Sequence, residues 1–176
     1  MIKLHDKKFE IYLESDVIQS AIKKVAGNID RHYQNSTPIF IAVLNGAFMF
    51  AADLLKNITI PCEIHFVKMS SYEGTTSTGD VKELIGMPKE INGRDLIILE
   101  DIVDTGTTID KIDEILKKHT PQSTKIASLL LKPEAYHNQI KIDYVGMEIP
   151  NEFVVGYGLD YDGLGRNYKD IYKIKN

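Results

Sequence analysis

One segment, residues 96–108, constrains the fold of this chain more than any other. Residues 96–99 are apolar and are flanked by polar ones, which is typical of a strand buried on both faces of a sheet. Apolar residues then recur at helical spacing over residues 109–116, so the chain passes from strand to helix at residues 104–108. A buried strand followed at once by an amphipathic helix favours an α/β fold.

The turn between this strand and this helix has the composition of a phosphate site. The first turn of a helix leaves backbone N–H groups unpaired at the positive end of the macrodipole, and a glycine lets a ligand approach them closely. The candidate phosphate ligands are Thr105, Gly106, Thr107 and Thr108. The turn has no lysine, so the Walker pattern of P-loop sites is absent and a single phosphate monoester fits better than a triphosphate.

Two carboxylates, Glu100 and Asp101, precede this turn. Carboxylates accept hydrogen bonds from a vicinal diol and bind Mg²⁺ through their oxygens. A ribose with a phosphate at one end and a diol in the middle would satisfy both halves of the segment. The alternative is an ordinary charged junction with Asp104 as a helix N-cap, but a cap needs one such residue and here there are several.

Composition narrows the class of protein. A length of 176 residues suits a single domain over residues 1–176, and 43% hydrophobic residues are ample for a core. A net charge of -4 and the lack of a basic run argue against nucleic acid as the main partner. The single Cys62 suits a reducing, cytoplasmic compartment. Charged residues in 1–13 leave no room for a signal peptide, and no apolar stretch reaches membrane-spanning length, so no membrane association is expected.

Strands alternate with helices along the rest of the chain. The expected strands are residues 39–44, 63–69, 125–131 and 144–149, and the expected helices begin at Ser15, a plausible N-cap, and at about Ala47. This order favours a largely parallel sheet with ligands at the carboxyl ends of the strands. The loops that this rule brings to one edge are Asn45–Gly46, the segment after Met69, the turn at 100–108, and Lys132–Pro133.

Residues 96–108 resemble the signature with which type I phosphoribosyltransferases bind 5-phosphoribosyl diphosphate (PRPP). Residues 148–161 closely resemble the purine-site segment of hypoxanthine-guanine phosphoribosyltransferases, and the resemblance extends from about Ile39 to Arg166. It implies the type I fold: a central, largely parallel sheet flanked by helices, a small hood from the chain ends and a mobile lid loop. It also implies Mg²⁺-dependent transfer of phosphoribose from PRPP to the 6-oxopurines hypoxanthine or guanine, in purine salvage.

The resemblance assigns a role to each matching residue. Asp104 would be the general acid or base at the purine N7. Lys132 would donate to the purine 6-oxygen and exclude adenine, because a lysine has nothing to accept from a 6-amino group. The other implied site residues are Glu100, Asp101 and Thr105 to Thr108 for PRPP, Asn45, Gly46 and Arg166 for pyrophosphate, Phe153, Val154 and Asp160 for the purine, Glu100, Asp101 and Asp160 for Mg²⁺, and Ser71 and Tyr72 for the lid.

Some features depart from the family pattern or stay open. Asn45 stands where many members have lysine, so we expect greater reliance on Mg²⁺ and Arg166 for pyrophosphate binding. Thr107 also stands where relatives often have lysine, but this difference is milder because the backbone does most of the phosphate binding. The Ser-, Thr- and Gly-rich segment 70–80 reads equally well as a solvated loop. A xanthine-preferring enzyme remains an alternative, as does an RNA-binding regulator with the same fold, although the acidic balance disfavours the latter. Relatives assemble as dimers or tetramers, which implies a homodimer or homotetramer.

Overall fold

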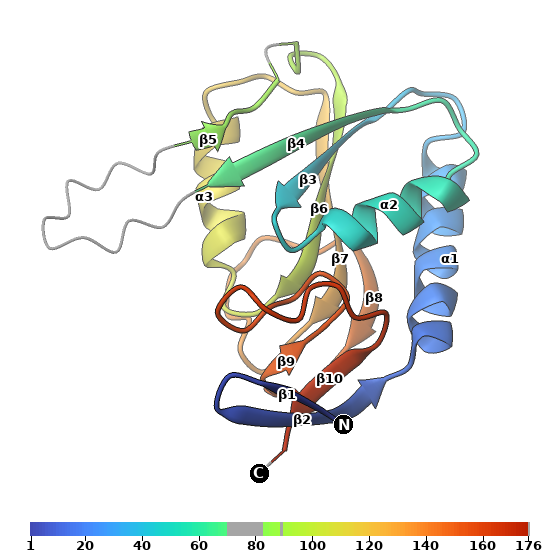
Figure 1. Ribbon diagram of the computed structural model, residues 1–176. Coiled ribbons are helices and arrows are strands. Elements are labelled where there is room, and N and C mark those ends of the chain that lie inside the picture. Colours follow the sequence, from blue (N-terminus) through green and yellow to red (C-terminus); the bar gives the residue numbers. More distant parts are fainter. Residues whose placement is uncertain (70–82, 89, 176) are drawn as a thin grey trace, which may run out of the picture.

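The structure, a computed structural model, describes residues 1–69, 83–88 and 90–175. Helices and strands alternate through most of the chain (Figure 1). In chain order the elements are β1 (Ile2–Leu4), β2 (Lys7–Leu13), α1 (Ser15–His32), β3 (Ile39–Leu44), α2 (Phe48–Asn57), β4 (Glu63–Met69), β5 (Glu83–Ile85), β6 (Asp95–Val103), α3 (Thr107–Leu116), β7 (Ser123–Leu131), β8 (Tyr144–Glu148), β9 (Val154–Val155) and β10 (Ile171–Ile174).

The larger sheet has the strand order β5-β4-β3-β6-β7-β8. Strands β4, β3, β6, β7 and β8 are parallel, and β5 pairs antiparallel with β4 at the edge. The prediction of a largely parallel sheet is therefore confirmed. The parallel arrangement brings the carboxyl ends of β3, β6 and β7 to the same edge, where the loops that follow them meet.

Helices cover both faces of this sheet: α1 and α2 lie on one face and α3 on the other (Figure 1). Strand β6 shows why its sequence is a continuous apolar run. Ile97 and Leu99 pack with α1 and α2, whereas Leu96 and Ile98 pack with α3, and all of them are fully buried. Alternate side chains of a strand point to opposite faces, so a sheet covered on both sides needs apolar residues at every position.

The second sheet joins both chain ends in the antiparallel order β1-β2-β10-β9 (Figure 1). It encloses a small core that contains Leu4, Phe9, Val155 and Tyr172. The expected hood from the chain ends is confirmed. Within β2, Phe9 is fully buried in this core while Lys8 and Ile11 are exposed, so burial does not follow a strict two-residue alternation along the strand.

Some expected boundaries were wrong. Ser15 is the first residue of α1 rather than its N-cap, and its backbone N–H donates to Asp170 Oδ1 at 2.8 Å. The amide of Ser15 is one of the N–H groups that the first turn of a helix leaves unpaired, and a residue 155 positions away accepts its hydrogen bond. Strand β7 begins at Ser123 rather than Lys125, whereas α2 begins at Phe48, within one residue of its expected start at about Ala47. No helix in the described ranges is long and apolar enough to cross a membrane.

Candidate functional site

The junction between β6 and α3 forms a cavity of about 270 Å³, lined by residues 100–109. Gly106 is the N-cap of α3 and has φ +92°, a left-handed conformation that glycine adopts without a steric penalty. Thr105 and Thr107 lie beside it, with their hydroxyl oxygens 3.1 Å apart. The structure thus gathers all the residues predicted to bind the sugar phosphate around one opening.

Glu100, which is buried, and Asp101, which is half-buried, form a carboxyl pair that lines this cavity. Glu100 is only 4% exposed, and burial raises its pKa well above the ordinary value, with the charge of Asp101 adding to the effect. Burial also raises the pKa of Asp101, whose Oδ1 accepts a hydrogen bond from the Ile102 amide at 2.9 Å. Within the described ranges neither carboxyl forms an ion pair with a lysine, arginine or histidine.

A divalent cation fits this pair. Two neighbouring acidic groups without an ion-pair partner among the described residues can bind Mg²⁺ through oxygen, and Mg²⁺ in proteins commonly takes its remaining ligands from water and substrate phosphates. The part of the chain that the structure describes has no cluster of three or more His, Cys, Asp or Glu side chains that could hold a metal alone. Glu100, Asp101 and Asp160 therefore do not form one closed site, and any Mg²⁺ here would depend on other ligands.

Asp104 and Lys132 meet across the carboxyl ends of β6 and β7. Lys132 directly follows β7, and its backbone N–H donates to Val103 O at 2.9 Å. Its Nζ lies 2.5 Å from Asp104 Oδ2. The structure thus pairs the predicted acid or base with the residue predicted to select the purine.

The predicted pyrophosphate turn packs tightly against two other parts of the site. The Leu44–Asn45 peptide bond is cis. A β-carbon on Gly46 would lie 1.7 Å from Asp101 Oδ2, and one on Gly158 would lie 2.2 Å from Gly46 O. Glycine is therefore required at both positions for the turn, the carboxyl pair and the loop after β9 to approach one another.

Arg166, predicted to bind pyrophosphate, is engaged by this same loop. Its Nη2 lies 2.6 Å from Asp160 Oδ1, and its Nη1 donates to Gly158 O at 2.7 Å. Asp160 Oδ2 also accepts a hydrogen bond from the Gly163 amide at 2.8 Å. Asp160 is thus paired with an arginine, whereas neither Glu100 nor Asp101 has an ion-pair partner among the described residues.

Phe153 presents an exposed aromatic ring at the hood, with the side chain 44% exposed, while its neighbour Val154 is buried. The ring of Tyr161 stands nearly perpendicular to that of Phe153, at 85° and a centroid distance of 5.7 Å. Phe9 lies beside both rings, with its centroid 6.2 Å from that of Phe153 and 6.1 Å from that of Tyr161. Sequence reasoning missed both neighbours; Tyr161 lies at the end of the segment 148–161 and could have been found, but nothing in the sequence links Phe9 to it.

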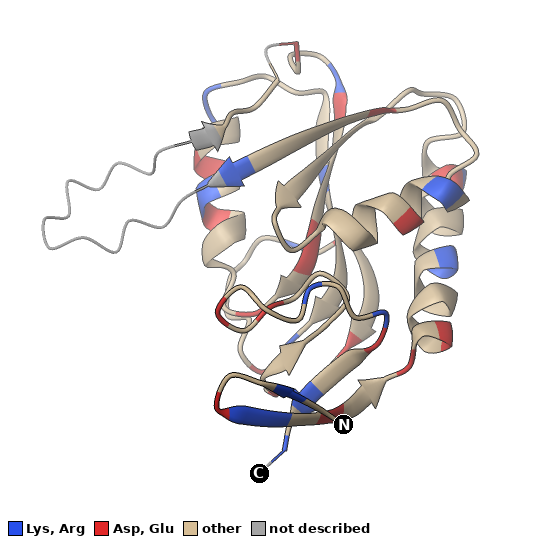
Figure 2. Cartoon of the chain, viewed as in Figure 1, with Lys and Arg blue, Asp and Glu red and all other residues tan. Residues whose placement is uncertain are grey.

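Charge is distributed unevenly around the site. Figure 2 shows acidic residues at the carboxyl end of β6, and basic residues interspersed with acidic ones on the hood strands. The predicted lid residues Ser71 and Tyr72 lie outside the described residues.

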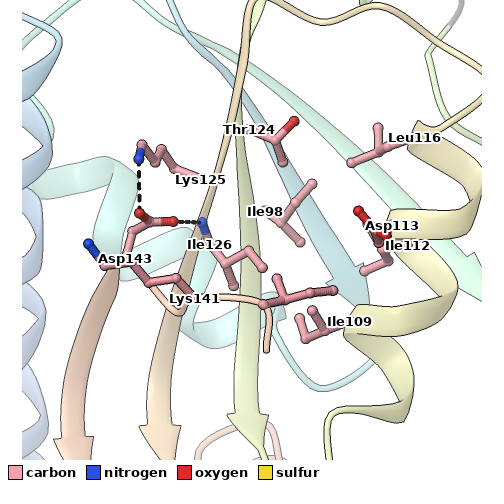
Figure 3. A pocket seen from close by; sticks show the side chains of 11 residues that line it. Ile98, Ile109, Ile112, Asp113, Leu116, Thr124, Lys125, Ile126, Lys141 and Asp143 are labelled. Carbon is pink, nitrogen blue, oxygen red and sulfur yellow. Dashed lines mark hydrogen bonds and ion pairs between the residues drawn. The ribbon is translucent and has the colours of Figure 1, made fainter. Parts of the chain in front are cut away.

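A second cavity, of about 260 Å³, lies between α3 and strands β6 and β7 (Figure 3). Its walls are mainly aliphatic, and at its rim Asp143 already pairs with Lys125 Nζ at 3.0 Å and accepts a hydrogen bond from the Ile126 amide at 3.0 Å. This cavity contains none of the residues predicted to bind PRPP or purine. The first cavity, and not the second, is therefore the candidate sugar-phosphate site.

Comparison with known proteins agrees with this geometry. The chain matches the phosphoribosyl transferase domain family over residues 10–162 and belongs to that family. Within it, the chain is similar to hypoxanthine-guanine phosphoribosyltransferases. It is 43% identical over 162 residues to the one from Streptococcus pyogenes, covering 92% of this chain and 88% of that protein. It is 39% identical over 167 residues to the one from Bacillus subtilis, covering 94% and 93%.

Solved structures lead to the same family. A hypoxanthine-guanine phosphoribosyltransferase from Bacillus anthracis superposes with a TM-score of 0.87 at 35% identity, covering 97% of this chain and 98% of that one. A hypoxanthine phosphoribosyltransferase from Staphylococcus aureus gives a TM-score of 0.87 at 40% identity, covering 97% and 92%. The expected type I phosphoribosyltransferase fold is thereby confirmed, while a single domain over residues 1–176 stays a prediction.

Proposed function

We propose that this protein salvages purines by transferring the 5-phosphoribosyl group of PRPP to hypoxanthine or guanine. The observation that carries the proposal is the ion pair of Lys132 with Asp104, because Asp104 also lines the cavity at the β6–α3 junction. The lysine can donate a hydrogen bond to an oxo group and the aspartate can exchange a proton. Relatives named for this activity, 39–43% identical over most of the chain, support the assignment.

PRPP would bind along the β6–α3 junction. The amides at the start of α3 and the hydroxyls of Thr105, Thr107 and Thr108 would bind the 5-phosphate, with Gly106 allowing close approach. Glu100 and Asp101 would accept hydrogen bonds from the ribose diol. The pyrophosphate group would lie toward the Asn45–Gly46 turn and Arg166.

The purine would lie between the Lys132 and Asp104 pair and the ring of Phe153. Phe153 would stack on the base, and the backbone at Val154 and Asp160 would bind the edge that carries the amino group of guanine. A purine nitrogen then forms a bond to the anomeric carbon as the bond from that carbon to pyrophosphate breaks, while Asp104 exchanges a proton with N7 and stabilises the positive charge that develops on the ribose. Attack opposite the leaving group would invert the anomeric centre.

Mg²⁺ would be held by Glu100 and Asp101, and on the pyrophosphate side by Asp160. When bound, it would neutralise negative charge on PRPP and on the leaving pyrophosphate. The neighbouring carboxyls of buried Glu100 and half-buried Asp101, which have no ion-pair partner among the described residues, support this part of the proposal.

We also propose that the protein is a cytoplasmic homodimer or homotetramer with no nucleic-acid or membrane partner. The single cysteine supports a cytoplasmic location, and the net charge of -4 argues against a nucleic-acid partner. Phe48 on α2 and Phe66 on β4, each 42% exposed, are apolar surface that a second copy could cover. Light scattering coupled to gel filtration gives the assembly state directly.

The test is nucleotide formation by the purified protein with PRPP and Mg²⁺, offering hypoxanthine, guanine, xanthine and adenine separately. We expect turnover of the first two and not of adenine, and a loss of at least about 100-fold in Asp104→Asn. Asp113→Asn, which alters a partly exposed carboxylate on α3, is the matched control and should be active.

Other outcomes favour the alternatives. Preferred turnover of xanthine would identify a xanthine-preferring enzyme. PRPP binding without turnover of any base would overturn the enzyme assignment and favour an RNA-binding regulator, which should then bind RNA with an affinity that falls steeply as salt is raised.

A further inference from the structure

A polar cluster outside the predicted site joins both helices of one sheet face to the loop after β9. The Tyr157 hydroxyl donates to Asp53 Oδ2 in α2. Gln19 Nε2 in α1 donates to the same carboxylate oxygen at 2.6 Å and lies 3.3 Å from the Tyr157 hydroxyl. Three segments far apart in the chain thus converge on one carboxylate.

Tyr157 is unusual in both burial and backbone conformation. Its side chain is 2% exposed, and its φ is +50°, in a region that bulky residues rarely adopt. It lies between Gly156 at φ +101° and Gly158 at φ +97°. Consecutive left-handed residues make a turn that needs tertiary contacts to hold it, and the bond to Asp53 is such a contact.

This turn is in direct contact with the pyrophosphate side of the site. Gly158 packs on Gly46 so closely that a β-carbon would lie 2.2 Å from Gly46 O. The Gly158 carbonyl accepts the hydrogen bond from Arg166 Nη1 at 2.7 Å, and the Gly158 amide donates to Arg166 O at 3.0 Å. The position of Gly158 therefore influences both the Asn45–Gly46 turn and Arg166.

The protonation states of Tyr157 and Asp53 favour a strong hydrogen bond between them. Burial and the neighbouring Asp53 raise the pKa of the Tyr157 hydroxyl, which stays a donor at neutral pH. Burial acts to raise the pKa of Asp53, but hydrogen bonds from Lys56, Tyr157 and Gln19 outweigh it and lower the pKa, so the carboxylate stays ionised. A neutral donor bonded to a charged acceptor makes a stronger hydrogen bond than a neutral pair.

We infer that Tyr157, held by Asp53 and Gln19, is a positioning residue for pyrophosphate: it holds Gly158 against Gly46 and so sets where Arg166 meets the diphosphate. This inference rests on the proposed function. Asn45 supplies no charge in the pyrophosphate turn, so the position of Arg166 has a larger effect here than in a chain with lysine at that position.

The experiment measures pyrophosphate binding by titration calorimetry with sodium pyrophosphate and MgCl₂, together with KM for PRPP and for hypoxanthine. Tyr157→Phe keeps the buried ring and removes only the hydroxyl. We expect about tenfold weaker pyrophosphate binding and a similar rise in KM for PRPP, with kcat and KM for hypoxanthine within about twofold of wild type.

Other variants separate positioning from general stability. Tyr144→Phe removes another buried hydroxyl, one without a hydrogen-bond partner among the described residues, and should leave pyrophosphate binding unchanged. Asp53→Ala should reproduce Tyr157→Phe, and provides the test if that variant does not fold. Asp53→Asn keeps an acceptor oxygen for the tyrosine and should retain most of the affinity.

Each outcome is decisive. Weaker pyrophosphate binding in Tyr157→Phe and Asp53→Ala but not in Tyr144→Phe supports the inference. Unchanged pyrophosphate affinity in the first two variants, with only a lower Tm, overturns it and leaves the proposed function intact. A wild-type protein that neither binds pyrophosphate nor forms nucleotide overturns the proposed function and the inference with it.

Discussion

Lys132 Nζ lies 2.5 Å from Asp104 Oδ2, and the two residues differ sharply in their access to water. The Lys132 side chain is 7% exposed, whereas that of Asp104 is 44% exposed. The ammonium has therefore lost most of its water, and the carboxylate is its close partner. The 6-oxygen and N7 are neighbouring atoms on one edge of a 6-oxopurine, so a donor and a proton acceptor at this spacing can face both.

Removing the ammonium should abolish selection of the 6-oxo group. Lys132→Met keeps a buried aliphatic side chain, and Asp104 stays hydrated, so we expect a small change in Tm. KM for hypoxanthine and for guanine should rise at least about tenfold, because the purine oxygen loses its donor. Initial rates with hypoxanthine, guanine and adenine measure the effect; an unchanged ratio of hypoxanthine to adenine turnover would mean that Lys132 does not select the base.

A methyl group at position 46 should displace the carboxyl of Asp101. The β-carbon in Gly46→Ala would lie 1.7 Å from Asp101 Oδ2, so one of the two must move. Misplacement of a binding group by about 1 Å can cost on the order of 100-fold, and we expect a loss of this size in kcat/KM for PRPP.

Gly27→Ala is the matched control for Gly46→Ala. Gly27 lies in α1 with nothing within 4 Å of its β-carbon position, so alanine should stabilise the helix by about 0.5–1 kcal/mol and leave kcat/KM unchanged. Steady-state kinetics and thermal unfolding on both variants provide the comparison. Full activity in Gly46→Ala would show that Asp101 tolerates displacement.

The buried carboxyl of Glu100 should make stability depend on pH. Burial, and then the charge of Asp101, raise the pKa of Glu100 above its ordinary value of 4.5. A carboxyl with a higher pKa in the folded state contributes stability that is fully present below the unfolded pKa and is lost as pH rises through the folded pKa. We therefore expect Glu100→Gln to unfold at least about 2 °C above wild type near neutral pH, with a smaller difference as pH falls toward 4.5.

Circular dichroism melts in EDTA across this pH range measure the difference in Tm. Added Mg²⁺ should narrow it by stabilising the wild type, because a ligand that binds only the folded state raises Tm. Glu114→Gln, at an exposed position on α3, should follow the wild type throughout. A Tm difference that does not change with pH would count against a buried ionising group.

A positive charge in the pyrophosphate turn should reduce the need for metal. Asn45→Lys places an ammonium beside Gly46, and we expect about fivefold lower KM for PRPP and a weaker dependence on Mg²⁺. KM measured over a series of Mg²⁺ concentrations tests this, with Asn35→Lys as a control that adds the same charge at an exposed position. No gain in affinity together with unchanged Mg²⁺ dependence would contradict the prediction.

The expected elements were most accurate where the pattern was contiguous. Strand β3 has the bounds expected from its apolar run, 39–44, and β4 has the expected bounds 63–69. The β6–α3 junction was also predictable, because its strand, glycine turn and helix follow one another directly in the chain. The N-terminal hairpin was not expected as strands, because β2 becomes a central strand only by pairing with β10 at the other end of the chain.

The amino-acid order alone identifies which chemical groups the candidate site contains, because the glycine, hydroxyls and carboxylates of 100–108 are neighbours along the chain. It does not specify which distant groups meet. The pairing of Lys132 with Asp104, the contact of Gly46 with Asp101, and the bond from Tyr157 to Asp53 each join separate segments. Such contacts follow from how the helices and the hood pack on the sheet, and the burial that this packing imposes on Glu100 raises its pKa.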